Sequence, residues 1–415
     1  MFRARLALTQ RVLVLTSASL VSFVVGGSCS VAAGLFLQPL LAEFHWANSL
    51  ASGIATAYIL ASLLAAPIAG ALMDRFGGRA LMASGLLITA VGFLGARYAG
   101  SAVGIYIAFV LAGLGSSAAY YVPVSVITTS WMGERKNLGM GIVMGATSIG
   151  AASASVLISW SIEKYGWHTP LETLAASMCL LLPLVLLTIE KGPSSSPTTP
   201  TSRSSRLLDS PAKTLLRSPL FLVGTGIGTL FNVGLASIYY HVVSLLEAAG
   251  YTAYMAGTVL GATWILSAFG SLILGTLAER RGAQPVLTAA LLSCALGTAL
   301  LIGANDGNWG LACVVGFALL WGATANSVSQ FLPVIFSELF GEAHLGMLLG
   351  VQSAVAGIAS AAAPLMTGFL YDKFKNYHAA ICFSVAATLL AALLTAFMRT
   401  PRSAEETSIQ PRPAN

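Results

Sequence analysis

The sequence predicts an all-α polytopic membrane protein with twelve transmembrane helices, arranged as two pseudosymmetric six-helix bundles with both termini cytoplasmic. Three observations lead to this prediction: scarce charge, twelve long apolar runs, and a repeat of about 205 residues. Of the 415 residues, 56% are hydrophobic and 9% are charged. An ordinary soluble protein carries about 25% charged residues. Because so few polar side chains cannot cover a soluble core of this size, lipid must surround much of the chain.

The apolar runs give the helix count. A helix needs roughly 20 mainly apolar residues to cross the hydrocarbon layer. Twelve runs meet this requirement: 12–37, 49–72, 80–99, 102–129, 138–160, 171–189, 219–246, 254–277, 284–303, 309–335, 345–370 and 377–398. The first run is longer than the apolar core of a cleaved signal peptide, so we expect an uncleaved first transmembrane helix.

Lysine and arginine predict the orientation. With a cytoplasmic N-terminus, 17 of the 21 basic residues fall on the cytoplasmic side and 4 on the outer side. This bias follows the positive-inside rule. Basic residues between apolar runs indicate membrane orientation and give no continuous surface for nucleic acid.

One long polar break divides the chain. Residues 190–218 are rich in Ser, Pro and Thr and then basic, which is typical of a flexible linker. Leu207 and Leu208, followed by residues 211–217, are expected to form a short surface helix. The predicted domains are an N-terminal six-helix bundle (1–189), a cytoplasmic linker (190–218), a C-terminal bundle (219–399) and a cytoplasmic tail (400–415).

The repeat indicates a duplicated six-helix unit. The pattern after the second run recurs after the eighth at an offset of 205, pairing Gly70, Asp74, Arg75 and Gly77 with Gly275, Glu279, Arg280 and Gly282. At an offset of 207, Leu138-Gly139-Met140 matches Leu345-Gly346-Met347.

These features resemble the major facilitator superfamily, whose most specific mark is the loop Gly70-x-x-x-Asp74-Arg75-x-Gly77-x-Arg79. Three further stretches resemble the monocarboxylate and oxalate:formate exchanger branches: residues 34–46, Gly113-Leu114-Gly115 with Tyr121-Val122-Pro123, and residues 134–141. The resemblance implies transport by alternating access through a cavity lined mainly by helices 1, 4, 7 and 10.

The two repeated loops are candidates for a conformational latch. By pseudosymmetry Asp74 is expected to face the start of helix 11, and Glu279 the start of helix 5. Each helix start is positive through its backbone dipole. The alternative is a solvated turn that anchors helix ends. The candidate latch residues are Gly70, Asp74, Arg75, Gly77, Arg79, Glu279 and Arg280.

Polar side chains at mid-depth are the candidates for a solute site, since such groups are costly in lipid. The predicted substrate-binding residues are Ser28, Tyr120, Tyr121, Asn232, Tyr240, Trp264, Asn326, Gln330 and Gln352. For a serine, helix–helix packing is the main alternative. His241 is a possible proton site, and a place at the membrane interface is an equal alternative.

No Lys, Arg, Asp or Glu lies deep within any predicted helix. The resembling families usually carry an Arg in helix 8 and often a Lys in helix 1 or 11 to pair with a carboxylate. Here helix 8 reads Gly261-Ala262-Thr263-Trp264-Ile265-Leu266. Because an unpaired buried carboxylate is very costly, either amides, hydroxyls and helix ends hold the anion, or the solute is neutral or zwitterionic.

We therefore expect a transporter of a small organic solute in a bacterial-type inner membrane, most simply a monocarboxylate or related organic acid. The alternative is an exporter or facilitator of neutral, aromatic or amphipathic molecules. The chain has no converging nucleophile, base or metal ligands, so it is not expected to be an enzyme. We expect a monomer with no cofactor, no metal and no nucleic-acid partner, and with possible coupling to protons.

Overall fold

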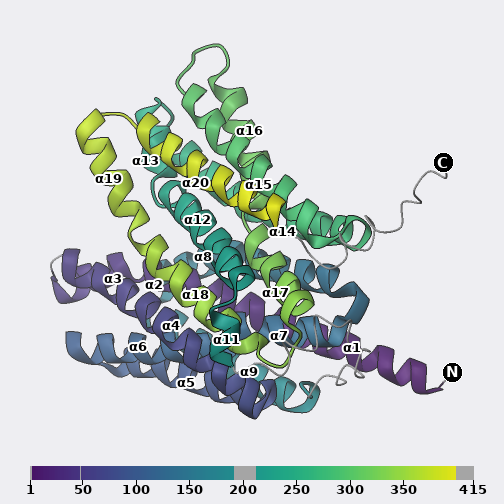
Figure 1. Cartoon of the computed structure of the whole chain (residues 1–415). Coiled ribbons are helices and arrows are strands. Elements are labelled where there is room, and N and C mark those ends of the chain that lie inside the picture. The colour runs from purple at the N-terminus through teal and green to yellow at the C-terminus, as the bar shows by residue number, and fades with distance from the viewer. Residues whose placement is uncertain (1, 47, 191–211, 399–415) are drawn as a thin grey trace, which may run out of the picture. The chain divides into compact units, whose positions relative to one another are not determined.

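The computed structural model describes residues 2–46, 48–190 and 212–398, and these residues are helical almost throughout (Figure 1). Before the predicted linker the elements are α1 (Phe2–Val21), the π-helix η1 (Ser22–Ser28), α2 (Cys29–Leu35), α3 (Leu37–Phe44), α4 (Asn48–Phe76), α5 (Gly78–Tyr98), α6 (Ala102–Ala119), α7 (Tyr121–Met132), the 3₁₀ turn η2 (Gly133–Arg135), α8 (Lys136–Tyr165) and α9 (His168–Thr188).

After the linker the elements are α11 (Ala212–Leu216), α12 (Pro219–Tyr239), α13 (Val242–Ala248), α14 (Ala253–Arg281), α15 (Ala283–Leu300), the 3₁₀ turn η3 (Leu301–Gly303), α16 (Gly310–Thr324), α17 (Ser327–Phe340), α18 (Leu345–Ala361), α19 (Ala363–Phe374) and α20 (His378–Phe397). Most of the predicted linker (191–211) and the predicted tail (400–415) lie outside the described residues.

The described helices account for the predicted crossings. Eleven helical runs in the described part of the chain are long and apolar enough to cross a membrane. One of them, Ala102–Tyr165, has 64 residues, which is enough for two crossings. Its chain turns at Gly133, where φ is +54°. Counted in this way, the runs give the twelve crossings that the sequence predicts.

Several helices extend beyond the predicted apolar runs. The run 49–72 lies within α4, which continues to Phe76, and the run 254–277 lies within α14, which continues to Arg281. These two predicted runs stop shortly before the first charged residue. A charged side chain can extend to water while its backbone stays helical, so the helix continues further.

Contacts divide the chain into two compact units. Unit 1 holds the described residues of 1–133, 142–196 and 346–354, and unit 2 holds those of 134–141, 197–345 and 355–415. The first residues of α8 therefore belong to unit 2, and most of the first half of α18 belongs to unit 1. The predicted division at the linker stays a prediction.

Each unit contains the same set of helix pairs. In unit 1, α5 packs on α6 and α9, and α4 packs on α6. In unit 2, α15 packs on α16 and α20, and α14 packs on α16. This correspondence extends the repeat from sequence to packing.

Backbone conformation follows the same repeat. The eight positive-φ residues of the described chain form four pairs at offsets of 205 to 209: His45 with Gly250, Gly77 with Gly282, Gly133 with Gly341, and Gly166 with Lys375. The left-handed conformation costs an ordinary side chain about 1–2 kcal/mol. His45 and Lys375 adopt this conformation although they are not glycine, which shows that the turn geometry is common to both copies.

Small residues allow α5 and α6 to lie side by side (Figure 1). A Cβ atom on Gly92 would lie 2.6 Å from the Ala112 backbone nitrogen and 2.7 Å from the Ala108 carbonyl oxygen. Without a difference in hydrophobicity between lipid and helix surfaces, such close backbone packing is a main source of helix association.

Gly92→Ala is expected to destabilise unit 1 by about 1–3 kcal/mol, because the added methyl group overpacks this contact. The matched control is Gly95→Ala on the same helix, where a Cβ would lie at an ordinary 3.5 Å from the Ala108 Cβ. We expect the control to leave stability unchanged or raise it slightly. Thermal unfolding of the purified protein in detergent compares the two, and equal midpoints would contradict the packing role of Gly92.

Candidate functional site

Five described crossings are interrupted: the eleventh at Ala362, between α18 and α19, and four others in two pairs at the repeat spacing. In unit 1, Phe36 separates α2 from α3 and Tyr120 separates α6 from α7. In unit 2, Tyr240 and His241 separate α12 from α13, and Ala325 with Asn326 separates α16 from α17. These are the first, fourth, seventh and tenth crossings. Substrate sites of secondary transporters are typically formed by such discontinuous helices.

Tyr120 holds the break of the fourth crossing. Its backbone (φ −113°, ψ −110°) lies outside the helical region. The Tyr120 ring fills the space beside Gly26 of η1, where a Cβ would overlap the ring. The Tyr120 hydroxyl hydrogen-bonds the Thr147 Oγ1 of α8 at 2.9 Å. Tyr120 therefore connects three crossings within unit 1.

The other predicted residues of unit 1 differ in exposure. The buried Ser28 donates its hydroxyl to the Phe23 carbonyl at 3.3 Å, within the π-helix. Tyr121 is half-buried, with its ring centre 6.4 Å from that of Tyr120. Gln352 of α18 is buried.

In unit 2 the predicted amides have unequal settings. The half-buried Asn232 donates to the Gly228 carbonyl of its own helix at 2.7 Å. Asn326 is half-buried at the break between α16 and α17. Gln330 is fully buried and donates to the Ser271 carbonyl of α14 at 3.0 Å, so its amide is part of the packing between α17 and α14.

Three aromatic rings gather where α12 ends. The Tyr239 ring centre lies 5.9 Å from that of Trp264 and 5.1 Å from that of Tyr240, both in edge-on geometry. Trp264 is half-buried and Tyr240 is exposed. Tyr239 links the two predicted residues.

The carboxylate of Asp74 caps the start of α18 within unit 1. Its two oxygens accept hydrogen bonds from the backbone N–H groups of Gly346 (3.0 Å) and Met347 (2.9 Å). The first N–H groups of a helix lack partners in their own helix, and the positive helix end favours an anion. Gly70 permits the approach, because a Cβ there would overlap the Gly346 carbonyl.

Glu279 makes the equivalent contact within unit 2. Its Oε1 accepts a hydrogen bond from the Leu138 N–H of α8 at 2.8 Å. Gly275 stands at the repeat position of Gly70, and a Cβ there would lie 2.9 Å from the Asn137 carbonyl oxygen. The two contacts join the helices that the sequence paired by pseudosymmetry.

The remaining latch candidates have different settings. Gly77 and Gly282 have φ of +80° and +87° at the starts of α5 and α15. Arg75 and Arg280 are exposed, and the Arg75 guanidinium carbon lies 5.1 Å from the centre of the Phe76 ring.

Lys136, the first residue of α8, makes contacts that the sequence did not predict. Its Nζ donates to the Ser337 Oγ at 3.0 Å and lies 3.7 Å from the Glu338 Oε1 of α17. Burial raises the pKa of the nearby Glu342 carboxyl, which Lys136 opposes. Lys136 stands two residues before Leu138, so a second polar contact holds the start of α8 in unit 2.

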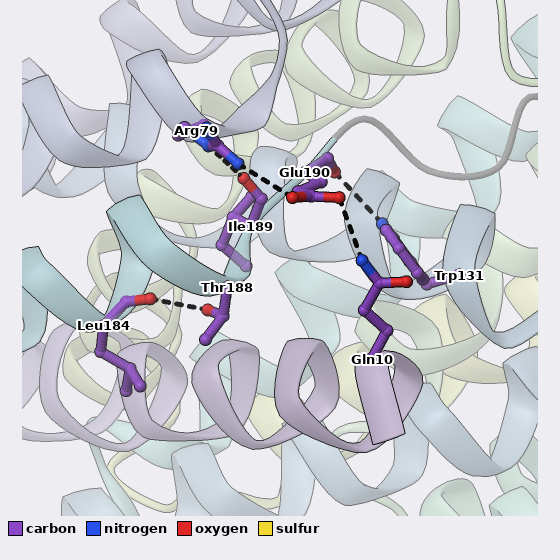
Figure 2. Close-up of polar contacts among 7 residues, drawn as sticks. All are labelled: Gln10, Arg79, Trp131, Leu184, Thr188, Ile189 and Glu190. Carbon is purple, nitrogen blue, oxygen red and sulfur yellow. Dashed lines mark hydrogen bonds and ion pairs between the residues drawn. The ribbon is translucent and has the colours of Figure 1, made fainter. Parts of the chain in front are cut away.

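Arg79 has a partner other than the latch helices (Figure 2). Its Nε donates to the Ile189 carbonyl at 2.6 Å, and its Nη2 lies 3.6 Å from the Glu190 Oε1. Trp131 and Gln10 donate to Glu190 from α7 and α1. Arg79 therefore fastens the end of α9 inside unit 1.

The second copy makes the same contact without charge. Gln284 stands 205 residues after Arg79 and donates to the Thr395 carbonyl at the end of α20, at 2.9 Å. Both side chains of the Arg79–Glu190 ion pair are about half exposed. Because exposed ion pairs contribute little, the carbonyl bond is the more important part of the Arg79 contact.

The free energy of unfolding of Arg79→Gln is accordingly expected to stay within about 0.5 kcal/mol of the parent value. Arg79→Ala is expected to lose about 1–2 kcal/mol, because it loses the hydrogen bond to the helix-end carbonyl. Thermal unfolding at low and high salt checks this. A large loss in Arg79→Gln that disappears at high salt would show that the ion pair, and not the carbonyl bond, stabilises this end of α9.

Comparisons with known proteins agree with this architecture. The model of the Major Facilitator Superfamily matches residues 18–333. Monocarboxylate transporter 13 of Bos taurus is 26% identical over 369 residues, covering 86% of this chain and 82% of that protein. The uncharacterized MFS-type transporter YcxA of Bacillus subtilis is 25% identical over 382 residues, covering 86% and 88%.

Solved structures agree on the fold. The proton:xylose symporter XylE superposes with a TM-score of 0.79 at 14% identity, covering 94% of this chain and 96% of that one. The fucose:proton symporter FucP of E. coli gives 0.73 at 17% identity, covering 94% and 100%. The family model matches more than half of the chain. This shows that the chain belongs to the Major Facilitator Superfamily, as a multi-pass membrane transporter of a small solute and not an enzyme.

Proposed function

We propose that the protein carries a small monocarboxylate or related organic acid by alternating access, in a bacterial-type inner membrane with both termini cytoplasmic. The observation that carries the solute class is the similarity over most of the chain to proteins named monocarboxylate transporters. The sequence stretches around Tyr121 and residues 134–141 support the same branch.

The proposed site is uncharged. In unit 1 Tyr121 and Gln352 supply a hydroxyl and an amide, and in unit 2 Asn232 and Asn326 each supply an amide. Ser28, Tyr120 and Gln330 already bond neighbouring backbone or side chains, so we assign them to holding the site in shape. A carboxylate held by neutral donors keeps its charge during transport, unless a proton moves with it.

The aromatic group of Tyr239, Tyr240 and Trp264 favours a second candidate, a neutral or aromatic solute. Aromatic rings bind such solutes through area and edge-to-face contacts and need no counter-charge.

Flux measurements in proteoliposomes test both candidates. We expect saturable counterflow of a labelled monocarboxylate such as lactate or benzoate. An anion carried alone accumulates about 50-fold under a potential of roughly 100 mV, since that potential is worth about 2.3 kcal/mol per charge. An anion carried with one proton follows a pH gradient instead. Counterflow of a neutral aromatic solute with none of the monocarboxylate would contradict the first candidate and favour the second.

We also propose that Asp74 and Glu279 form a conformational latch, with Gly70, Arg75, Gly77, Arg79 and Arg280 shaping the two loops. Each carboxylate stabilises a helix start that belongs, in sequence, to the other half of the chain. In this proposal the contacts form in the outward-open state and break in the inward-open state, as alternating access requires. The contacts stabilise the state that contains them by roughly 0.5–2 kcal/mol each.

Substitutions at Asp74 separate charge from hydrogen bonding. Asp74→Asn retains a capping oxygen and loses the charge, so about 0.3–1 kcal/mol is expected to be lost. Asp74→Ala loses both and is expected to shift the population by about 0.5–2 kcal/mol. Glu279→Gln and Glu279→Ala are the matched pair in the other copy.

Accessibility of single cysteines introduced along the proposed solute path measures the population shift. Unchanged accessibility in both alanine variants, with normal expression and thermal stability, would contradict the latch.

A further inference from the structure

Residues of the eleventh crossing stabilise the break in the seventh crossing. At the break the His241 N–H donates to the Ile238 carbonyl, three residues earlier, at 3.0 Å. In a regular α-helix it would donate to the Ser237 carbonyl, four residues earlier. The Ser237 carbonyl accepts the hydroxyl of Thr367, on α19, at 3.2 Å in a buried position. An unpaired carbonyl is costly in a membrane, so the break depends on α19.

The imidazole of His241 makes a second link to α19. Its Nε2 lies 3.1 Å from the Pro364 carbonyl oxygen, just after the helix break at Ala362. Pro364 has no N–H and helps to end α18 there. One side chain therefore joins the break of the seventh crossing to the break of the eleventh, both within unit 2.

The strength of this link depends on protonation. A carbonyl oxygen only accepts, so Nε2 must carry a hydrogen to bond it. The neutral tautomer with its hydrogen on Nδ1 would place a lone pair against the Pro364 oxygen. The imidazolium always presents Nε2–H, and a hydrogen bond from a charged donor is about twice as strong as a neutral one.

Few titratable groups face the imidazole. The Tyr377 ring centre, before α20, lies 6.1 Å from that of His241. Tyr371 of α19 and Glu247 of α13 interact with Tyr377, and burial is the main cause that raises the Tyr377 pKa, so this phenol stays neutral. Asp372 and Lys373 at the end of α19 are exposed, and Tyr239 and Tyr240 precede His241 on its own chain. Among the described residues His241 forms no ion pair.

We infer that His241 is a proton-binding site that fastens α13, the last part of the seventh crossing, to α19. It lies at the end of unit 2 opposite to Glu279, on the side that the positive-inside count assigns to the outside. Protons on that side hold α13 in place, and their loss frees it to move. This makes the mobility of one segment of an interrupted crossing depend on external pH.

Hydrogen–deuterium exchange of the full chain in nanodiscs tests this directly and needs no solute, so the result is independent of the proposed solute class. The α13 amides are compared at about pH 5.5 and about pH 7.5, on either side of the ordinary histidine pKa of about 6.5. After correction for intrinsic rates, we expect about fivefold slower exchange at the lower pH, from the stronger charged hydrogen bond.

Three variants identify the group responsible. His241→Gln retains an N–H donor without titrating, so its α13 protection is expected to be independent of pH. His241→Phe loses the link and is expected to exchange fast at both values. His378→Gln, an exposed histidine of the same unit, should behave as the parent. Equal protection of the parent at both values, or pH dependence that persists in His241→Gln, would overturn the inference.

Discussion

In a membrane every backbone N–H and C=O must find a partner inside the protein, and this constraint governs the structure wherever a helix is interrupted. At the seventh crossing the Ser237 carbonyl, left without its helical N–H, accepts the Thr367 hydroxyl. At the start of α18, two N–H groups bond the Asp74 carboxylate. Thr367 and Asp74 therefore compensate backbone groups at a helix break and at a helix start, and both lie at features proposed to move.

Duplication explains why several helix-end contacts occur in pairs, and comparison of the two copies shows which feature each contact requires. Arg79 and Gln284 bind equivalent helix ends, one with a charge and one without, so the geometry requires a donor and not a cation. His45 and Gly250 share a left-handed turn, so that turn requires the conformation and tolerates a side chain. Asp74 and Glu279 differ in length, and both reach a helix start, which indicates that the anion is the common requirement.

An uncharged interior makes the proposed solute path depend on neutral donors and on aromatic surface. With no Lys or Arg deep in any predicted crossing, nothing in the sequence offers a carboxylate a full counter-charge. Proton movement is one way in which an organic acid crosses such an interior at low cost. Separately from any proton that moves with the solute, His241, joined to Pro364 at one end of unit 2, is the group through which we infer that protons act on α13.

Local composition alone determined the helical class, the twelve crossings and the repeat, because hydropathy and spacing do not depend on the neighbours that a helix later acquires. It also predicted that Asp74 and Glu279 face helix starts, since their loops are short and repeated. Tertiary structure decided what composition cannot encode: the breaks at Tyr120 and His241, the Arg79 contact with the end of α9, and the burial of Gln330. These features depend on which surface of another helix meets a residue across hundreds of positions in sequence, and a single run of apolar residues carries no record of that partner.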